Sequence, residues 1–171
     1  EAVAEGRVPA IKTKRVNYPD EFLRRVIDTG LGLTLLPQLE ASDCRLLAVL
    51  AWLLLTVLFA VRASTLGAMK SEADVYEKDG KLCLVLHHIK WWRHGKQSGT
   101  NRRIPLVREG RYGIPFEVGG DSWRDLACRI IFCARDNGVL MLGTERGYKG
   151  AADIFNRSLK RFGFSLETEE T

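Results

Sequence analysis

The sequence LLAVLAWLLLTVLFAV occupies residues 46–61 and is followed at once by Arg62. A segment this apolar has no polar face, so it predicts a helix that is either buried on all sides or inserted in a membrane. A cation at the end of a buried helix is costly unless it binds a partner. The role of Arg62 is therefore the question on which the interpretation of the whole chain depends.

A membrane-spanning helix is the first interpretation of this segment. Such a helix needs about 20 apolar residues, whereas the segment offers sixteen between Arg45 and Arg62. The chain also has 27% charged residues, no second apolar segment and no signal-peptide pattern at its start. We therefore expect the core helix of a globular domain, with Ser42 or Asp43 as its N-cap. A small membrane-anchored protein remains the alternative.

The charge of the chain is unevenly distributed. The 26 Lys and Arg residues exceed the 21 Asp and Glu residues only slightly, which gives a net charge of +5. Between residues 87 and 108, however, there are six Lys or Arg, three His and no acidic residue. A basic segment between acidic flanks predicts a phosphate-binding surface, with a solvated hairpin tip as the alternative.

Neither the cysteines nor the histidines predict a metal site. The four cysteines have no zinc-like spacing and are interpreted as reduced thiols of an intracellular protein: Cys44, Cys83, Cys128 and Cys133. His87 and His88 are adjacent in an expected strand, so their side chains point to opposite faces.

The remaining patterns predict a mostly helical domain with a small sheet. We expect an extended leading segment over residues 1–17, one domain over 18–164 and an acidic tail over 165–171. Further helices are expected over 18–30, 123–136 with Ser122 as N-cap, and 151–162 with Gly163 as its stop. Strands are expected over 73–76, 82–90 and 102–106, and loops over 30–37, 108–120 and 139–148. The expected fold class is α+β, mostly α, with a three-stranded antiparallel sheet.

The order of these motifs resembles the catalytic domain of the tyrosine recombinases, the phage-integrase superfamily. The family's first signature is an arginine in a box such as Arg-x-x-Glu-Leu at the end of a buried helix, and the sequence RASTL at 62–66 is similar to it. The second is a lysine on a β-hairpin before a strand of the form basic-Ile-Pro-Leu, similar to Lys90 and to RIPL at 103–106. The expected helix 151–162 is similar to the one that precedes the family's His-x-x-Arg box.

The resemblance implies a mechanism and a set of site residues. In the family, a tyrosine hydroxyl attacks a DNA phosphodiester and forms a 3′-phosphotyrosyl link. Arg62 is then one half of an arginine clamp on the phosphate. Lys90, or Lys96 as the second choice, gives a proton to the departing 5′-oxygen. The expected DNA contacts are Trp91, Trp92, Arg93, Lys96, Arg102 and Arg103. No metal ion or cofactor is implied.

The chain departs from the family pattern in several places. Thr65 stands where the family usually has an acid, and Ala60 where it usually has a glycine. There is no His-x-x-Arg box, and no tyrosine follows Tyr148. We therefore expect a C-terminally incomplete domain of a recombinase or integrase of a mobile element, which cannot cleave DNA alone. A non-catalytic DNA-binding or assembly module derived from such a domain is the alternative.

The resemblance also implies partners and a location. The expected partner is double-stranded DNA, on which the complete protein forms a homo-oligomer during recombination or integration. No membrane partner is expected, and the expected location is inside the cell, in the nucleus or cytoplasm.

Overall fold

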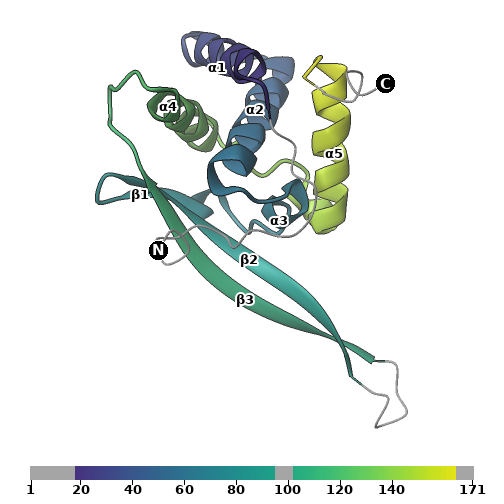
Figure 1. Ribbon diagram of the computed structural model, residues 1–171. Coiled ribbons are helices and arrows are strands. Elements are labelled where there is room, and N and C mark those ends of the chain that lie inside the picture. Colours follow the sequence, from purple (N-terminus) through teal and green to yellow (C-terminus); the bar gives the residue numbers. More distant parts are fainter. Residues whose placement is uncertain (1–17, 95–101, 165–171) are drawn as a thin grey trace.

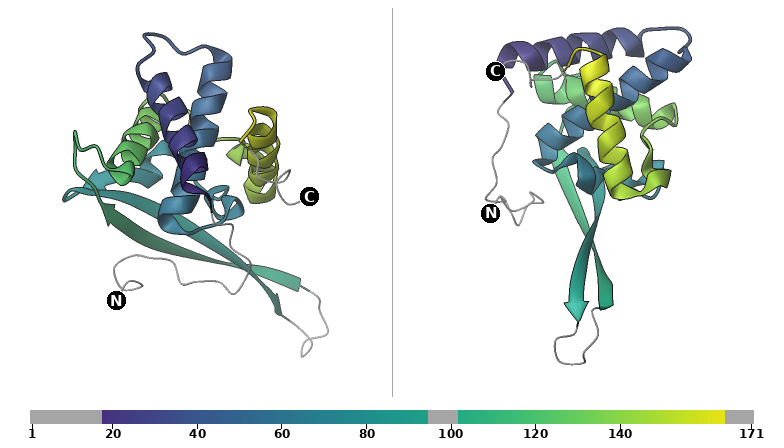
Figure 2. Two further views of the ribbon diagram at one scale, coloured as in Figure 1. Left: turned by 45° about the horizontal axis from the view of Figure 1, so that its top comes forward. Right: turned by 90° about the vertical axis from the view of Figure 1, so that its right-hand side faces the viewer.

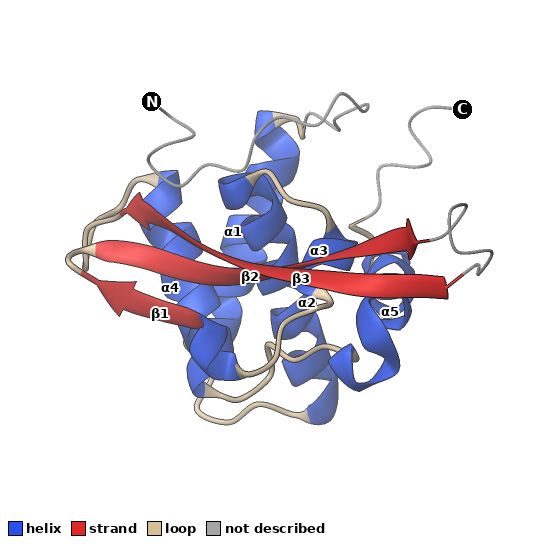
Figure 3. Ribbon diagram, turned by 90° about the horizontal axis from the view of Figure 1, so that it is seen from below, coloured by secondary structure: helices blue, strands red, loops and turns tan. Residues whose placement is uncertain are grey.

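A three-stranded antiparallel sheet lies against one side of a body of helices (Figure 1). The computed structural model describes residues 18–94 and 102–164, and within them there are five α-helices and three strands in the order β1-β2-β3. In the view of Figure 3 the sheet lies in front of the helices, so the helices cover one of its faces. The fold class is therefore α+β, mostly α, as the sequence predicted. The predicted leading segment and acidic tail lie outside the described residues.

The predicted core helix is α2, Ala41–Phe59. It packs against α1, α3, α4 and α5, and every residue from 47 to 55 is buried. Inside the core, the Trp52 indole donates a 2.7 Å hydrogen bond to the Leu140 carbonyl. By length and composition α2 could also cross a membrane. A core helix meets the same criteria, and burial against four other helices is the packing of a core helix.

Both ends of α2 have defined caps. The N-cap is Glu40 rather than the predicted Ser42 or Asp43, because Glu40 and Asp43 form a capping box in which the Glu40 amide donates to Asp43 Oδ2 at 3.0 Å. At the other end Ala60 adopts the left-handed conformation, with φ 54° and ψ 45°. The amides of Ala60 and Val61 both donate to the Thr56 carbonyl. The chain therefore turns sharply just before Arg62.

Helix α1, Asp20–Thr34, continues past Gly30, so the prediction of a loop from residue 30 was wrong. Gly30 is buried against α4, where a Cβ atom would lie 2.6 Å from Ile130 Cδ1. This glycine therefore permits the close approach of two helices and does not end α1. The helix ends before Pro37, which disfavours helical conformation in the residue that precedes it.

Strands β2, Lys81–His94, and β3, Arg102–Pro115, are longer than predicted, while β1, Val75–Lys78, begins two residues late. The late start has a local cause, since Glu72–Asp74 form a 3₁₀ turn. The predicted loop from residue 108 is strand as far as Pro115. Gly113 is paired with Cys83, where a Cβ atom would lie 3.3 Å from the thiol sulfur. This glycine reflects crowding within the sheet and not a turn.

Two helices follow the sheet. Helix α4, Trp123–Asp136, begins as predicted at Ser122, whose hydroxyl accepts a hydrogen bond from the Asp125 amide. Helix α5, Gly147–Arg161, begins four residues before the predicted start, after a 3₁₀ turn at Thr144–Arg146. Gly163 follows α5 with φ 80°, as expected of a residue that ends a helix.

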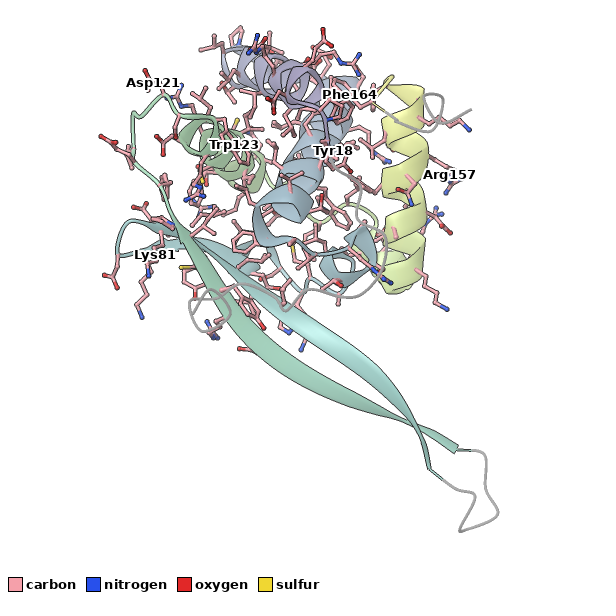
Figure 4. All side chains as sticks on the ribbon, in the orientation of Figure 1. Tyr18, Lys81, Asp121, Trp123, Arg157 and Phe164 are labelled. Carbon is pink, nitrogen blue, oxygen red and sulfur yellow. The ribbon has the colours of Figure 1, made fainter. Side chains whose placement is uncertain are left out.

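An aromatic cluster joins the beginning of α1 to the end of α5. The ring of Tyr18 stacks on Phe22 with 5.1 Å between centroids, and Phe22 contacts the edge of Phe164 at 6.2 Å. The Arg25 guanidinium lies 4.2 Å from the centroid of Phe164 and donates a hydrogen bond to the Gly163 carbonyl. Burial in this cluster raises the pKa of Tyr18. Figure 4 shows Tyr18 and Phe164 at this junction.

Candidate nucleic-acid interface

The β2–β3 hairpin extends far beyond the helical body. β1 pairs only with residues 81–84 of β2, so from residue 85 onward β2 pairs with β3 alone. We call residues 85–94 and 102–111 the arm. Ten residues of strand span about 33 Å. Val85, Leu86 and His87 are buried at the base of the arm, and Figures 1 and 2 show the two strands continuing from there away from the helices. The arm is therefore long enough to reach a partner that the body does not contact.

Most of the predicted DNA-binding residues belong to the arm. Lys90, Trp91, Trp92 and Arg93 are on β2, Arg102 and Arg103 are on β3, and Lys96 lies outside the described residues. The register places Arg93 opposite Arg103 and His94 opposite Arg102. Like charges directly opposite one another destabilise a pair of strands. The backbone register thus places two arginines at opposed positions on the arm.

Arg62 lies at the corner between the arm and the helices. It is not the last residue of α2, as the sequence suggested, but the N-cap of α3, Ala63–Leu66. Its carbonyl accepts hydrogen bonds from the amides of Thr65 and Leu66, and its side chain is exposed. Because α3 packs against both β2 and α5, Arg62 begins an element held between the arm strand and the last helix (Figure 1).

Helix α5 carries exposed cations that the sequence analysis did not single out. Its exposed side chains include a single acid, Asp153, and four cations. The cations are Lys149, Arg157, Lys160 and Arg161. In Figure 4 Arg157 points away from the body. Spacings of three and four residues place Lys149, Arg157 and Lys160 on one face of the helix together with Asp153, a pattern that is visible in the sequence. Because residues 139–148 were predicted to be a loop, the start of α5 at Gly147 was missed.

Two partly buried carboxylates, Asp74 and Glu72, hold the chain between α3 and β1. Asp74 Oδ2 lies 3.1 Å from His87 Nε2 on β2 and accepts the Lys70 amide at 2.8 Å. The Glu72 carboxylate accepts the amides of Leu140 and Met141 at 3.2 and 3.3 Å. Burial raises the pKa of Glu72, an effect that these two hydrogen bonds partly offset. The segment after α3 is thus tied to the sheet on one side and to the chain between α4 and α5 on the other.

The described part of the chain offers no obvious metal centre. Among the side chains that the structure describes, no three from His, Cys, Asp or Glu are grouped so as to bind an ion. The cysteines in this part are unpaired thiols, and burial raises the pKa of Cys128 to about 12. A thiol with so high a pKa remains protonated at neutral pH and is a poor ligand and nucleophile.

Comparisons of the chain with protein-family models, with curated proteins and with solved structures found no match.

Proposed function

We propose that the chain is the DNA-binding part of a catalytic domain of the tyrosine-recombinase type, and that its arm contacts the phosphates of duplex DNA. The observation that carries the proposal is the arm itself, a projecting hairpin in the one segment of the chain, 87–108, that has six Lys or Arg and no acid. Clustered cations on an extended element are the electrostatic footprint of a nucleic-acid partner. The opposed Arg93 and Arg103 support the same partner.

The conformation at the end of α2 gives independent support. The family usually has glycine two residues before its first arginine, and Ala60 occupies that position here. Ala60 is left-handed, with φ 54°, and this is a conformation that glycine adopts far more readily than alanine. The position thus has the backbone that explains the family's preference. Arg62 follows this turn as an exposed residue.

The chain would supply only part of the groups that cleave DNA in the implied mechanism. A guanidinium can bind two oxygens of a phosphate at once, so Arg62 would stabilise the charge that develops during strand cleavage. Lys90 would supply the proton for the departing 5′-oxygen, with Lys96 as the second candidate. In the complete protein, a second arginine and a nucleophilic tyrosine would provide the rest. The process would be site-specific recombination or integration of a mobile element by a homo-oligomer on DNA, in the nucleus or cytoplasm.

Fluorescence anisotropy of a labelled duplex tests the proposal. We expect weak binding with little sequence preference and strong salt dependence, with a slope of about 0.9 log unit per phosphate contact for each decade of salt. Reversal of two adjacent charges, R102E with R103E, should abolish binding. The matched control is R24E with R45E, which changes the net charge equally at exposed positions on α1 and α2.

The control variant should retain most of the affinity, because α1 and the beginning of α2 lie at the end of the body away from the arm (Figure 1). Equal losses in both variants would mean that only net charge matters. Binding that is indifferent to salt, or unaffected by the arm variant, would refute the proposed interface.

A non-catalytic module derived from the same domain is the second candidate. The specific observation in its favour is Thr65, which stands in α3 where the family usually has an acid. Such a module would use the same arm to bind DNA, and only a cleavage assay separates the two candidates.

A further inference from the structure

His87 occupies the root of the arm. It is one of two buried polar side chains in the described part of the chain, with 6% of its surface exposed. The core residues Leu82, Leu84 and Leu86 precede it on β2, and the strand continues from it into the arm. A contact made by His87 therefore acts where the arm leaves the body.

The partner of His87 belongs to the chain that follows α3. Asp74 Oδ2 is 3.1 Å from His87 Nε2, and the Asp74 carboxylate is itself only 13% exposed. The same oxygen accepts the Lys70 amide at 2.8 Å. One carboxylate oxygen thus joins the backbone of the segment between α3 and β1 to a side chain of the arm strand.

Stability alone does not account for this contact. A buried ionic or polar pair is often no more stabilising than apolar side chains of the same volume, because desolvation offsets the attraction between the partners. What a directional pair provides is a defined geometry. Since β1 covers β2 only over residues 81–84, and Leu86 is the last residue of β2 in the buried core cluster, the contact of His87 lies where the core ends.

We infer that the Asp74–His87 pair is a positioning contact that fixes the arm relative to α3 and so sets the separation of Arg62 from Lys90. Lys90 lies three residues beyond His87, about 10 Å along the strand, and Arg62 begins the helix whose following segment holds Asp74. The effect on DNA binding rests on the proposed function. The effect on the geometry of the arm does not.

The geometric effect can be measured without DNA. Spin labels at I104C on the arm and N156C on α5, in a background with C44S and C133S, report the arm-to-body distance by pulsed electron paramagnetic resonance. We expect one narrow distribution for the parent chain and a broadened or shifted one for H87L. The variant H87Q restores an amide donor near Asp74 and should narrow the distribution again.

The matched control is V85A, two residues earlier on the same buried strand. It leaves a cavity and so should lower the stability, but it should leave the distance distribution unchanged. If H87L does not fold, D74S takes its place, because serine is too short to reach His87. A distribution in H87L or D74S identical to that of the parent chain, or equal broadening in V85A, would overturn the inference.

The consequence for DNA is measured separately by anisotropy. If the arm and Arg62 no longer reach the DNA together, about one phosphate contact is lost. The salt slope should then fall by about 0.9 and the affinity at 0.1 M salt by about eightfold. If the parent chain does not bind duplex DNA, the proposed function fails while the distance measurement still tests the positioning contact. A broadened arm with unchanged affinity and slope would remove the link between the contact and DNA binding.

Discussion

Replacing Ala60 by glycine should stabilise the protein. Ala60 holds a left-handed conformation with φ 54° and ψ 45°, which costs an L-residue roughly 1–2 kcal/mol relative to glycine. Glycine loses more backbone entropy on folding than alanine, and this loss offsets about 0.4–1 kcal/mol of the gain. The expected net gain in the free energy of unfolding is about 0.5–1 kcal/mol, or about 1–4 °C in Tm for a chain of this size.

The surroundings of Ala60 prevent it from relaxing into another conformation. Val61 is buried, and the amides of Ala60 and Val61 are both bound to the Thr56 carbonyl. The left-handed turn is therefore imposed by packing on either side of it. Glycine at this position would remove the strain and keep both hydrogen bonds.

Urea unfolding of A60G, monitored by circular dichroism, measures the effect. Two control variants, D79G and G163A, also change a residue with positive φ. D79G should gain less, since Asp79 has the same φ of 54° but aspartate tolerates this region better than alanine. G163A should lower the free energy of unfolding by about 1 kcal/mol, because Gly163 has φ 80°. An added Cβ atom would meet no other atom there, so the loss would come from the backbone conformation alone. If A60G is less stable than the parent chain while G163A behaves as expected, the reasoning about Ala60 is wrong.

Further predictions concern pH and cleavage. The pKa of Asp125 is lowered chiefly by a hydrogen bond from the Glu117 amide and also by Ser122, so its contribution to stability is present above the ordinary carboxyl pKa of 3.8 and is lost as pH falls through the lower folded value. Stability curves of the parent chain and D125N should therefore converge once the pH falls below the lowered pKa of Asp125 in the folded protein, and a gap that persists in stronger acid would contradict this role. The 171-residue chain should form no covalent adduct with a nicked suicide duplex on a denaturing gel, because it lacks the second arginine and the tyrosine of the implied mechanism. An adduct that disappears in Y148F would show instead that the chain carries its own nucleophile.

The sequence was most informative where one residue type decides the structure. The uninterrupted apolar segment predicted α2, Ser122 predicted the start of α4, and alternating leucines predicted β2. Glycines were the main source of error. Gly30 was interpreted as the end of a helix and Gly113 as part of a loop, whereas they permit close packing against Ile130 and Cys83. Whether a glycine provides a turn or a close approach depends on its partner in space, which local sequence does not reveal.

The candidate site was less predictable than the fold. The arm could be expected from its charge, but its length could not, because β3 was interpreted as ending at residue 106. The Asp74–His87 contact joins residues in two elements that are 13 positions apart in the sequence, and no local pattern pairs them. The roles of Arg62 and Lys90 come from the resemblance and stay predictions.

The cluster of Tyr18, Phe22, Arg25 and Phe164 has a consequence for how this domain can be linked to other polypeptides. Because the cluster brings the first and last described residues to one place, a polypeptide attached before residue 18 and another attached after residue 164 would leave the body from neighbouring points. The domain could thus be inserted into a surface loop of a host protein with only short linkers. It would project from the host as a single lobe, with the arm directed away from the junction (Figure 2).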